Sequence, residues 1–199
     1  MDHLWTPWRY AYVTQPETGS PESNAQPNKE TRPGVPPALA AWPGDHHCVF
    51  CNLVAAADYA IEQGMAPEAA DRAANIVLRG PACYVCLNSY PYSTGHVMVV
   101  PYVHEASLAA LAGQTAQEMM ALAQRIARAL EQAYHPDGMN LGLNQGKAAG
   151  AGVAGHLHLH ALPRWLGDTN FMTVVGETRV LPETLEQTWE RLHAALSHS

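Results

Sequence analysis

Runs of apolar residues predict a sheet of five strands in the middle of the chain. The runs at 76–79, 84–87 and 97–100 have the length and composition of strands, and a Gly-Pro-Ala turn separates the first two. Residues 139–143 and 156–161 alternate apolar residues with small or polar ones, as strands with one buried face do. We expect these five segments to form the sheet.

Two segments with apolar residues at steps of three and four are predicted to be helices. The longer one follows Thr115 and Glu118, which match a capping box, and it ends at the His-Pro-Asp-Gly sequence that begins at His135. The shorter one carries its apolar stripe on Leu185, Trp189, Leu192 and Leu196. Strands gathered around one long helix, without regular β-α-β alternation, indicate an α+β fold. The expected architecture is a largely antiparallel five-stranded sheet with one long helix and a C-terminal helix.

Changes in composition predict three parts of the chain. Residues 1–47 hold a short aromatic arm and then a linker, because residues 15–46 contain seven of the fifteen prolines and no helix or strand period. An ordered domain is expected at 48–175, and a helical tail at 176–199.

Charge and cysteine usage exclude several classes of protein. The net charge of −7 provides no large basic surface, so no nucleic-acid partner is expected. The N-terminus lacks a secretory signal pattern, and no stretch approaches the ~20 apolar residues that span a bilayer. The four cysteines lie in two C-x-x-C pairs, which favours metal binding or free thiols in a reducing compartment. We therefore expect a cytoplasmic protein without membrane contact.

Three histidines alternate with apolar residues near the end of the predicted domain. Side chains of a strand alternate between its two faces, so His156, His158 and His160 are expected to project from the same face. A reactive site uses such an array, with one imidazole as nucleophile or ligand and the others holding it. The alternatives are a polar strand face or a histidine-rich metal-binding tract.

A glycine-rich loop at 144–153 leads into these histidines. Glycines let backbone N–H groups approach an anion closely, and Lys147 and Arg164 add positive charge on either side. A phosphate beside a histidine nucleophile indicates phosphoryl or nucleotidyl transfer through a His–P bond. The G-x-S-x-G sequence of one large class of acyl-transferring enzymes is absent from the sequence.

The two C-x-x-C pairs lead to different predictions. Cys48 and Cys51 have the spacing with which two thiolates hold one zinc ion, and two free thiols are the alternative. Cys83 and Cys86 lie on a predicted strand, where positions three apart face opposite sides, so they are expected to be core residues.

Several of these motifs together resemble the histidine triad (HIT) superfamily. They are the histidine motif at 155–164, the loop at 144–150 and the Thr-Gly-His-Val sequence at 94–97. The Leu-Trp-Thr-Pro-Trp-Arg arm at 4–9 and the run at 163–172 are similar to a bacterial branch that contains diadenosine tetraphosphate phosphorylases and hydrolases. The resemblance covers residues 48–175, which makes this segment the HIT domain.

The resemblance implies a role for each matching residue. His158 would be the nucleophile that forms a nucleotidyl-histidine, His160 would contact the phosphate, and His96 would fix ring orientation. Asn88 matches an asparagine that binds the ribose hydroxyls, and Asn144 matches an amide that contacts the phosphates.

The resemblance implies a further role for the loop, and position and charge suggest roles for three other residues. Gly150, Ala151 and Gly152 would offer backbone N–H groups. Many relatives carry a Ser, Thr or Gln within this loop, whereas Ala151 and Gly152 have no side-chain donor. From their positive charge, Lys147 and Arg164 are expected to hold an incoming phosphate. Trp165 would stack on a base or act as a rim anchor.

The resemblance also implies a structural Zn²⁺ site. Zinc-containing relatives use a histidine at the place of His104 and the first histidine of the triad, His156, in addition to Cys48 and Cys51. His46 or His47 are alternatives for one of these ligands.

The expected reaction is phosphorolysis of an adenine dinucleoside polyphosphate, with diadenosine tetraphosphate giving ADP and ATP. The alternatives are hydrolysis, with water instead of inorganic phosphate as acceptor, a nucleotide-binding sensor with little turnover, and a purely metal-binding module. Relatives are dimers or larger, so we expect a homodimer or larger homo-oligomer, with the long helix and a sheet edge at the interface.

Overall fold

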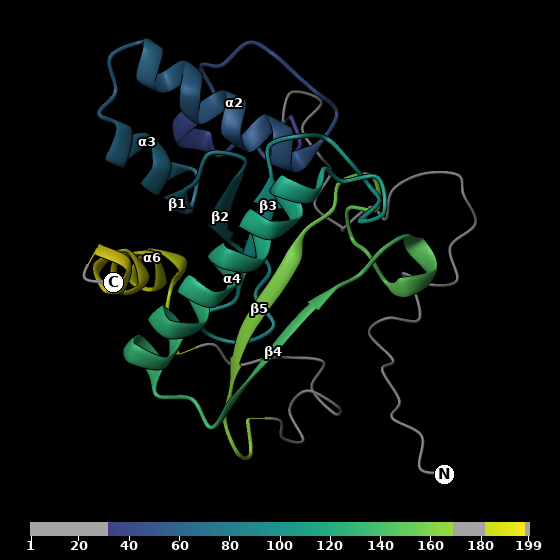
Figure 1. Ribbon diagram of the computed structural model, residues 1–199. Helices are drawn as coiled ribbons and strands as arrows, with labels where there is room; N and C mark the ends of the chain where they lie inside the picture. The colour runs from purple at the N-terminus through teal and green to yellow at the C-terminus, as the bar shows by residue number, and fades with distance from the viewer. Residues whose placement is uncertain (1–31, 169–181, 198–199) are drawn as a thin grey trace, which may run out of the picture. The chain divides into compact units, whose positions relative to one another are not determined.

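The predicted five-stranded sheet is present in the structure. Figure 1 shows the computed structural model, which describes residues 32–168 and 182–197. All neighbouring strands pair antiparallel, in the order β1-β2-β3-β5-β4. The strands are β1 (Ile76–Arg79), β2 (Cys83–Leu87), β3 (Val97–Pro101), β4 (Gly138–Leu143) and β5 (Leu159–Arg164).

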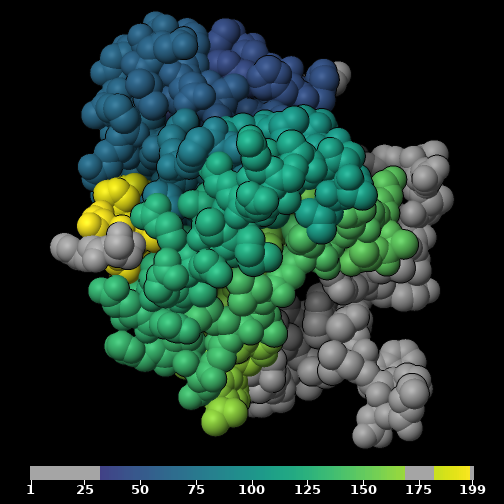
Figure 2. Space-filling model, viewed as in Figure 1, coloured from purple at the N-terminus to yellow at the C-terminus, as the bar shows by residue number. Residues whose placement is uncertain are grey.

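Helices cover both faces of this sheet. Helices α4 (Gly113–Tyr134) and α6 (Leu185–Ser197) lie on one face, where they share a buried apolar core with strand residues such as Val85, Val99 and Ala161. In Figure 1, α4 crosses in front of the sheet, and in Figure 2 the teal and green residues of this middle part of the chain fill much of the surface that faces the viewer. We call the buried core between α4, α6 and the sheet the α4-side core. The α+β architecture with one long helix and a C-terminal helix is confirmed.

A second buried core lies on the opposite face of the sheet. It is formed by α2 (Val49–Glu62), α3 (Pro67–Ala73), the short 3-10 helix η1 (Pro37–Leu39) and sheet residues such as Tyr84 and Met98. We call it the α2-side core. The sequence pattern did not predict these helices, because α3 is short and α2 carries apolar residues around most of its circumference. None of the helices in the two described ranges is long and apolar enough to cross a membrane.

Part of the predicted linker belongs to this second core. Leu39 and Trp42 are buried in it, and the amide of Asn52 in α2 binds the backbone of His46 and Pro33. The aromatic arm and residues 169–175 lie outside the described residues, and the three-part division of the chain stays a prediction.

The predicted start of the long helix was wrong. Helix α4 begins at Gly113 after Ala112, and no side chain caps it. The carboxylate of Glu118 does not turn back on its own helix; it accepts hydrogen bonds of 3.0 Å from the backbone N–H groups of Ala82 and Cys83. It therefore ties α4 to the β1–β2 turn. The predicted stop is confirmed, because His135 is the C-cap and has left-handed backbone angles.

Strand β4 lies at the edge of the sheet and pairs only with β5 among the described strands. Its alternation is weaker than predicted, because Met139 and Leu143 pack against the α4-side core whereas Leu141 is 49% exposed. The homodimer expected to use the long helix and a sheet edge stays a prediction.

The role of Glu118 gives a test of the packing. We expect Glu118→Ala to lower the free energy of unfolding by about 1–3 kcal/mol, because it leaves two partly buried N–H groups without a partner. Thr115→Ala is the control and should have little effect, since Thr115 does not cap the helix. Urea denaturation of both variants measures the difference. Equal losses would indicate a capping box after all.

Candidate catalytic and metal-binding site

The three histidines of the motif lie on one side of the chain, as predicted. Leu157, Leu159 and Ala161 enter the α4-side core, and the histidines between them face the other way, where Phe50 of α2 contacts His156 and His158. The sheet pairing itself begins only at Leu159. His156 and His158 therefore lie in the segment that leads into β5 and are not part of its ladder.

One ring nitrogen of His158 is held by a hydrogen bond, and none of the described residues makes a hydrogen bond to the other. Its Nδ1 lies 2.8 Å from the backbone carbonyl oxygen of His156. A carbonyl only accepts hydrogen bonds, so Nδ1 carries the proton and Nε2 keeps its lone pair. Burial lowers the pKa of His158 below its usual value, which favours the neutral ring. This is the protonation state that a histidine nucleophile requires.

His96 and His160 form a directed pair beside this ring. The backbone N–H of Tyr92 donates to Nδ1 of His96 at 3.1 Å, so the proton of neutral His96 is on Nε2, which lies 2.9 Å from Nδ1 of His160. His160 is then left with its own proton on Nε2. Burial, and then the neighbouring His158, lower the pKa of His160 to about 4. The rings of His158 and His160 are 4.8 Å apart in a T-shaped arrangement.

The residues expected to bind ribose and phosphate make contacts within their own loops. The amide of Asn88 accepts the N–H of Tyr90 at 2.9 Å, and its nitrogen lies 3.3 Å from Nδ1 of His96. Gly150 and Ala151 donate their N–H groups to carbonyls of the same loop. The ligand-binding roles of Asn88, Gly150, Ala151 and Gly152 stay predictions.

Strand pairing places the beginning of the glycine-rich loop beside the histidines. Leu143 pairs with Leu159, so Asn144 begins the loop next to His158. Lys147 starts the short 3-10 helix η2 (Lys147–Ala149) and its side chain is exposed. Both residues therefore belong to the segment around the predicted phosphate site.

Arg164 and Trp165 lie at the other end of β5. Arg164 is six positions after His158, which along an extended chain sets their Cα atoms about 20 Å apart. Arg164 donates instead to the side chain of Asn140 on β4, and Trp165 packs edge to face against Tyr134. Within one chain, Arg164 therefore does not hold a phosphate at His158. The packing of Trp165 supports the rim anchor over base stacking beside His158.

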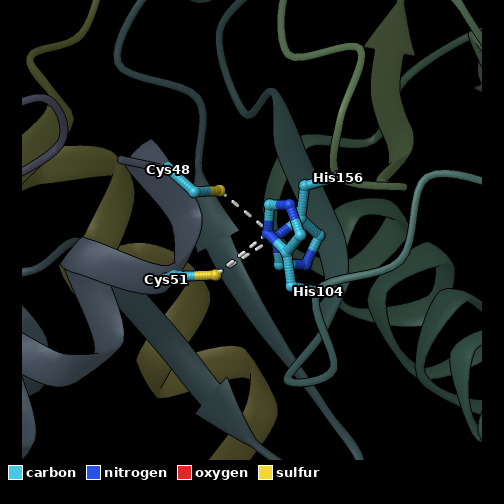
Figure 3. Close-up of side chains that lie close together, drawn as sticks. All are labelled: Cys48, Cys51, His104 and His156. Atoms are coloured by element: carbon cyan, nitrogen blue, oxygen red, sulfur yellow. Dashed lines mark hydrogen bonds between the residues drawn. The ribbon is translucent and has the colours of Figure 1, made fainter. Parts of the chain in front are cut away.

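The four predicted metal ligands come together at the start of α2. Figure 3 shows Cys48 and Cys51 pointing toward His104 and His156. One donor atom from each lies within 4.8 Å of the other three. Nδ1 of His156 is 3.3 Å from Cys48 Sγ and 3.5 Å from Cys51 Sγ, and Nδ1 of His104 is 3.3 Å from Cys51 Sγ. Tetrahedral zinc bonds of about 2.3 Å to sulfur and 2.0–2.1 Å to nitrogen set these donors about 3.5 Å apart, so the cluster fits a zinc ion.

The tautomer of His156 and the two neighbouring thiols also favour binding of a cation. Nε2 of His156 donates to the carbonyl of Pro101 at 2.9 Å, which leaves the lone pair of Nδ1 directed at the thiols. Burial and the neighbouring Cys48 raise the pKa of Cys51 to about 11. Two thiolates at neutral pH therefore need a positive charge between them.

The other cysteines and histidines considered as ligands lie elsewhere. His46 packs against Trp42, and His47 pairs with Asp45, so neither belongs to the cluster. Cys83 enters the α4-side core and Cys86 the α2-side core, which confirms that they face opposite sides of β2. Burial raises the pKa of each of these two thiols to about 12.

A pocket of about 480 Å³ opens beside the cluster. Cys51 and His104 line one part of it, and the aromatic rings of Phe50 and Tyr102 line another. The thiol of Cys51 and the ring of His104 are thus accessible from outside the core.

Two residues of the site were not predicted from the sequence. Phe50 contacts the rings of His156 and His158, and Tyr92 binds His96 through its backbone and packs its ring 4.8 Å away. The available signals were the position of Phe50 between the two cysteines and that of Tyr92 four residues before His96.

Comparison with known proteins identifies the family. The HIT domain model matches residues 70–165. A protein of Mycobacterium tuberculosis (strain H37Rv) named AP-4-A phosphorylase is 35% identical over 189 residues, which are 94% of this chain and 80% of that protein. The chain belongs to the HIT family.

Solved structures of HIT proteins agree with the fold. A zinc-bound histidine triad family protein from Mycobacterium smegmatis is 35% identical, with a TM-score of 0.55 over 76% of this chain and 94% of that one. A hypothetical histidine triad nucleotide-binding protein from Sulfolobus tokodaii is 23% identical, with a TM-score of 0.57 over 76% and 93% of the two chains. At that identity the second likeness supports only the fold.

The geometry of the metal cluster leads to a test in this HIT protein. We expect one zinc ion per chain to co-purify, and Cys48→Ser to lose both the metal and thermal stability. Zinc binding is linked to folding by roughly 10–16 kcal/mol in small zinc peptides. Cys86→Ser, at a buried cysteine outside the cluster, is the control and should keep the metal. Elemental analysis and thermal unfolding provide the measurements. Native protein without metal but with an intact fold would show that the cluster is not a zinc site.

Proposed function

We propose that this HIT-family enzyme transfers an adenylyl group from a diadenosine polyphosphate to inorganic phosphate through a nucleotidyl-histidine at His158. The proposal rests on the Nε2 atoms of two neighbouring histidines, one with a lone pair and the other with a proton. His158 has the lone pair of Nε2 available, and the adjacent His160 has an N–H group on its own Nε2. The relationship to a protein named AP-4-A phosphorylase supports the substrate class.

In the first step, Nε2 of His158 attacks the α-phosphorus of the substrate. A P–N bond forms, and the bond between that phosphorus and the bridging oxygen breaks. With diadenosine tetraphosphate the leaving group is ATP, which takes the electron pair, and AMP stays on the histidine. The carbonyl of His156 stabilises the positive charge that develops on the ring, since it accepts the Nδ1 proton at 2.8 Å.

His160 and the loop stabilise the charge on the phosphate. The N–H on Nε2 of His160 donates to a non-bridging oxygen, and His96 keeps this proton in place through its bond to Nδ1. Backbone N–H groups of the glycine-rich loop supply further donors when the loop closes on the substrate. The loop has no side-chain donor at Ala151 or Gly152, and a polyphosphate is a stable anion that leaves with little help from an acid.

In the second step, an oxygen of inorganic phosphate attacks the phosphorus, the P–N bond breaks and ADP leaves. This reverses the geometry of the first step, with phosphate in the place of ATP. Lys147 is the basic side chain in the loop that begins beside His158, and we assign it to holding the incoming phosphate. The zinc ion, held by Cys48, Cys51, His104 and His156, would stabilise the lead-in to the nucleophile and has no part in the chemical steps.

The role of the nucleophile is tested by substitution. We expect His158→Ala to lower turnover of diadenosine tetraphosphate on the order of a thousandfold or more, because no other atom can form the covalent intermediate. Nucleotide binding should persist, as measured by calorimetry. The control is His47→Asn, at an exposed histidine outside the site, which should retain full activity. Near-native turnover by the His158 variant would rule out the covalent route.

The choice of acceptor is tested with and without phosphate. We expect ADP and ATP from diadenosine tetraphosphate when phosphate is present, and little AMP in a phosphate-free buffer. Lys147→Ala should raise the KM for phosphate severalfold by removing a positive charge near the site. Arg164→Ala should leave this KM unchanged, because Arg164 lies at the far end of β5. Chromatography of the products provides the measurement. Equal AMP release in both buffers would make water the acceptor, and binding without turnover would make the protein a sensor.

A further inference from the structure

Phe50 connects the metal-binding turn to the reactive histidine. Its ring is 5% exposed and lies between two imidazoles, 4.9 Å from the ring of His158 and 5.4 Å from that of His156. Its own carbonyl accepts the hydroxyl of the buried Tyr84 at 3.1 Å. Phe50 is therefore held in place at both its backbone and its side chain.

The ring of His158 needs such a contact. Its hydrogen bond to the carbonyl of His156 fixes Nδ1, but the torsion that turns a histidine ring has broad minima. A small rotation would swing Nε2 away from the phosphorus while leaving Nδ1 near its acceptor. His160 contacts the ring edge to face at 4.8 Å, and Phe50 contacts it at a tilt of 47°. These two contacts limit the rotation.

The metal ligands set the position of Phe50. Cys48 is the N-cap of α2 and Cys51 lies in its first turn, so Phe50 lies between the two cysteines in sequence, on the same helical turn. The N-terminus of α2 has no side-chain hydrogen bond to cap it. A metal ion bound to both cysteines would anchor this turn to His104 and His156.

We propose that Phe50 is a positioning residue for the nucleophile, and that metal binding by the Cys-Val-Phe-Cys turn fixes the ring of His158 through it. Phe50 does not touch the reacting atoms; it acts by restricting the rotation of the His158 ring. This inference rests on the proposed role of His158 as the nucleophile.

The test replaces the aromatic ring with a side chain of similar size. In Phe50→Leu we expect kcat for diadenosine tetraphosphate to fall about 10–100-fold, as displacements of a reacting group do, with KM changed less than about threefold. Phe50→Met is a second, milder variant and should show a smaller fall of the same kind. Leu39→Ala, which opens a cavity in the same α2-side core without touching a histidine, is the control and should lose stability but keep kcat.

A spectroscopic measurement separates positioning from a merely structural role. In nitrogen-labelled protein, the Nδ1–H signal of His158 should be sharp and protected from exchange in the parent, and broadened in Phe50→Leu. Stripping the metal from the parent with a chelator, which the exposed side of the cluster admits, should broaden the same signal. Stripping it from Phe50→Leu should add little, because the contact is already lost.

The outcomes distinguish this inference from the proposed function. If His158→Ala loses turnover but Phe50→Leu keeps native kcat, or its His158 signal stays sharp, the positioning role is wrong and the nucleophile stands. If His158→Ala retains turnover, the proposed function fails, and the nuclear resonance signal alone decides whether Phe50 holds the ring. A rise in KM with unchanged kcat in Phe50→Leu would instead make Phe50 a substrate contact.

Discussion

His156 connects the cluster of Cys48, Cys51 and His104 to His158, the proposed nucleophile, through three different atoms. Its Nε2–H donates to Pro101, its Nδ1 faces the thiols of Cys48 and Cys51, and its backbone carbonyl accepts the Nδ1 proton of His158. Each of these bonds fixes the direction of the next. If the His156 ring turned over, Nδ1 would no longer face the thiols, and movement of its backbone would release the ring of His158.

Hydrogen-bond donors and acceptors also fix the protons of the rings on the other side of His158. The N–H of Tyr92 sets the tautomer of His96, and His96 in turn sets that of His160. Burial lowers the pKa of His156, His158 and His160, so the rings stay neutral and these directions persist at neutral pH. A set of neutral imidazoles thus presents a lone pair and an N–H side by side, which suits attack on a phosphorus atom and stabilisation of its oxygens.

Short-range periodicity predicted much of this structure. The alternation of the histidine motif placed three imidazoles opposite Leu157 and Leu159, and the C-x-x-C spacing predicted that Cys48 and Cys51 lie together; both follow from the regular geometry of one segment. The pairing of Glu118 with the β1–β2 turn could not be predicted, because it joins residues about 35 positions apart. Helix α2 was missed because its apolar residues leave no polar stripe.

Other differences concern what a side chain does once the chain is folded. The ribose-binding role of Asn88 stays a prediction, but the hydrogen bond that its amide oxygen accepts from the N–H of Tyr90 is one that a sequence motif does not reveal. Arg164 is only six residues from His158 in sequence, but an extended strand turns that into a long distance in space. Phe50, by contrast, is far from His158 in sequence, by more than a hundred positions, but contacts its ring directly in space.

The covalent bond to His158 is the central claim, and mass spectrometry tests it most directly. The enzyme is mixed with diadenosine tetraphosphate without phosphate and quenched into alkali, which preserves a P–N bond, before digestion into peptides. We predict one adenylyl group on the peptide that contains the motif, attached to His158, and its disappearance when phosphate is added before the quench. An unmodified His158 under conditions in which the enzyme turns over, or an adenylyl group on a different residue, would contradict this mechanism.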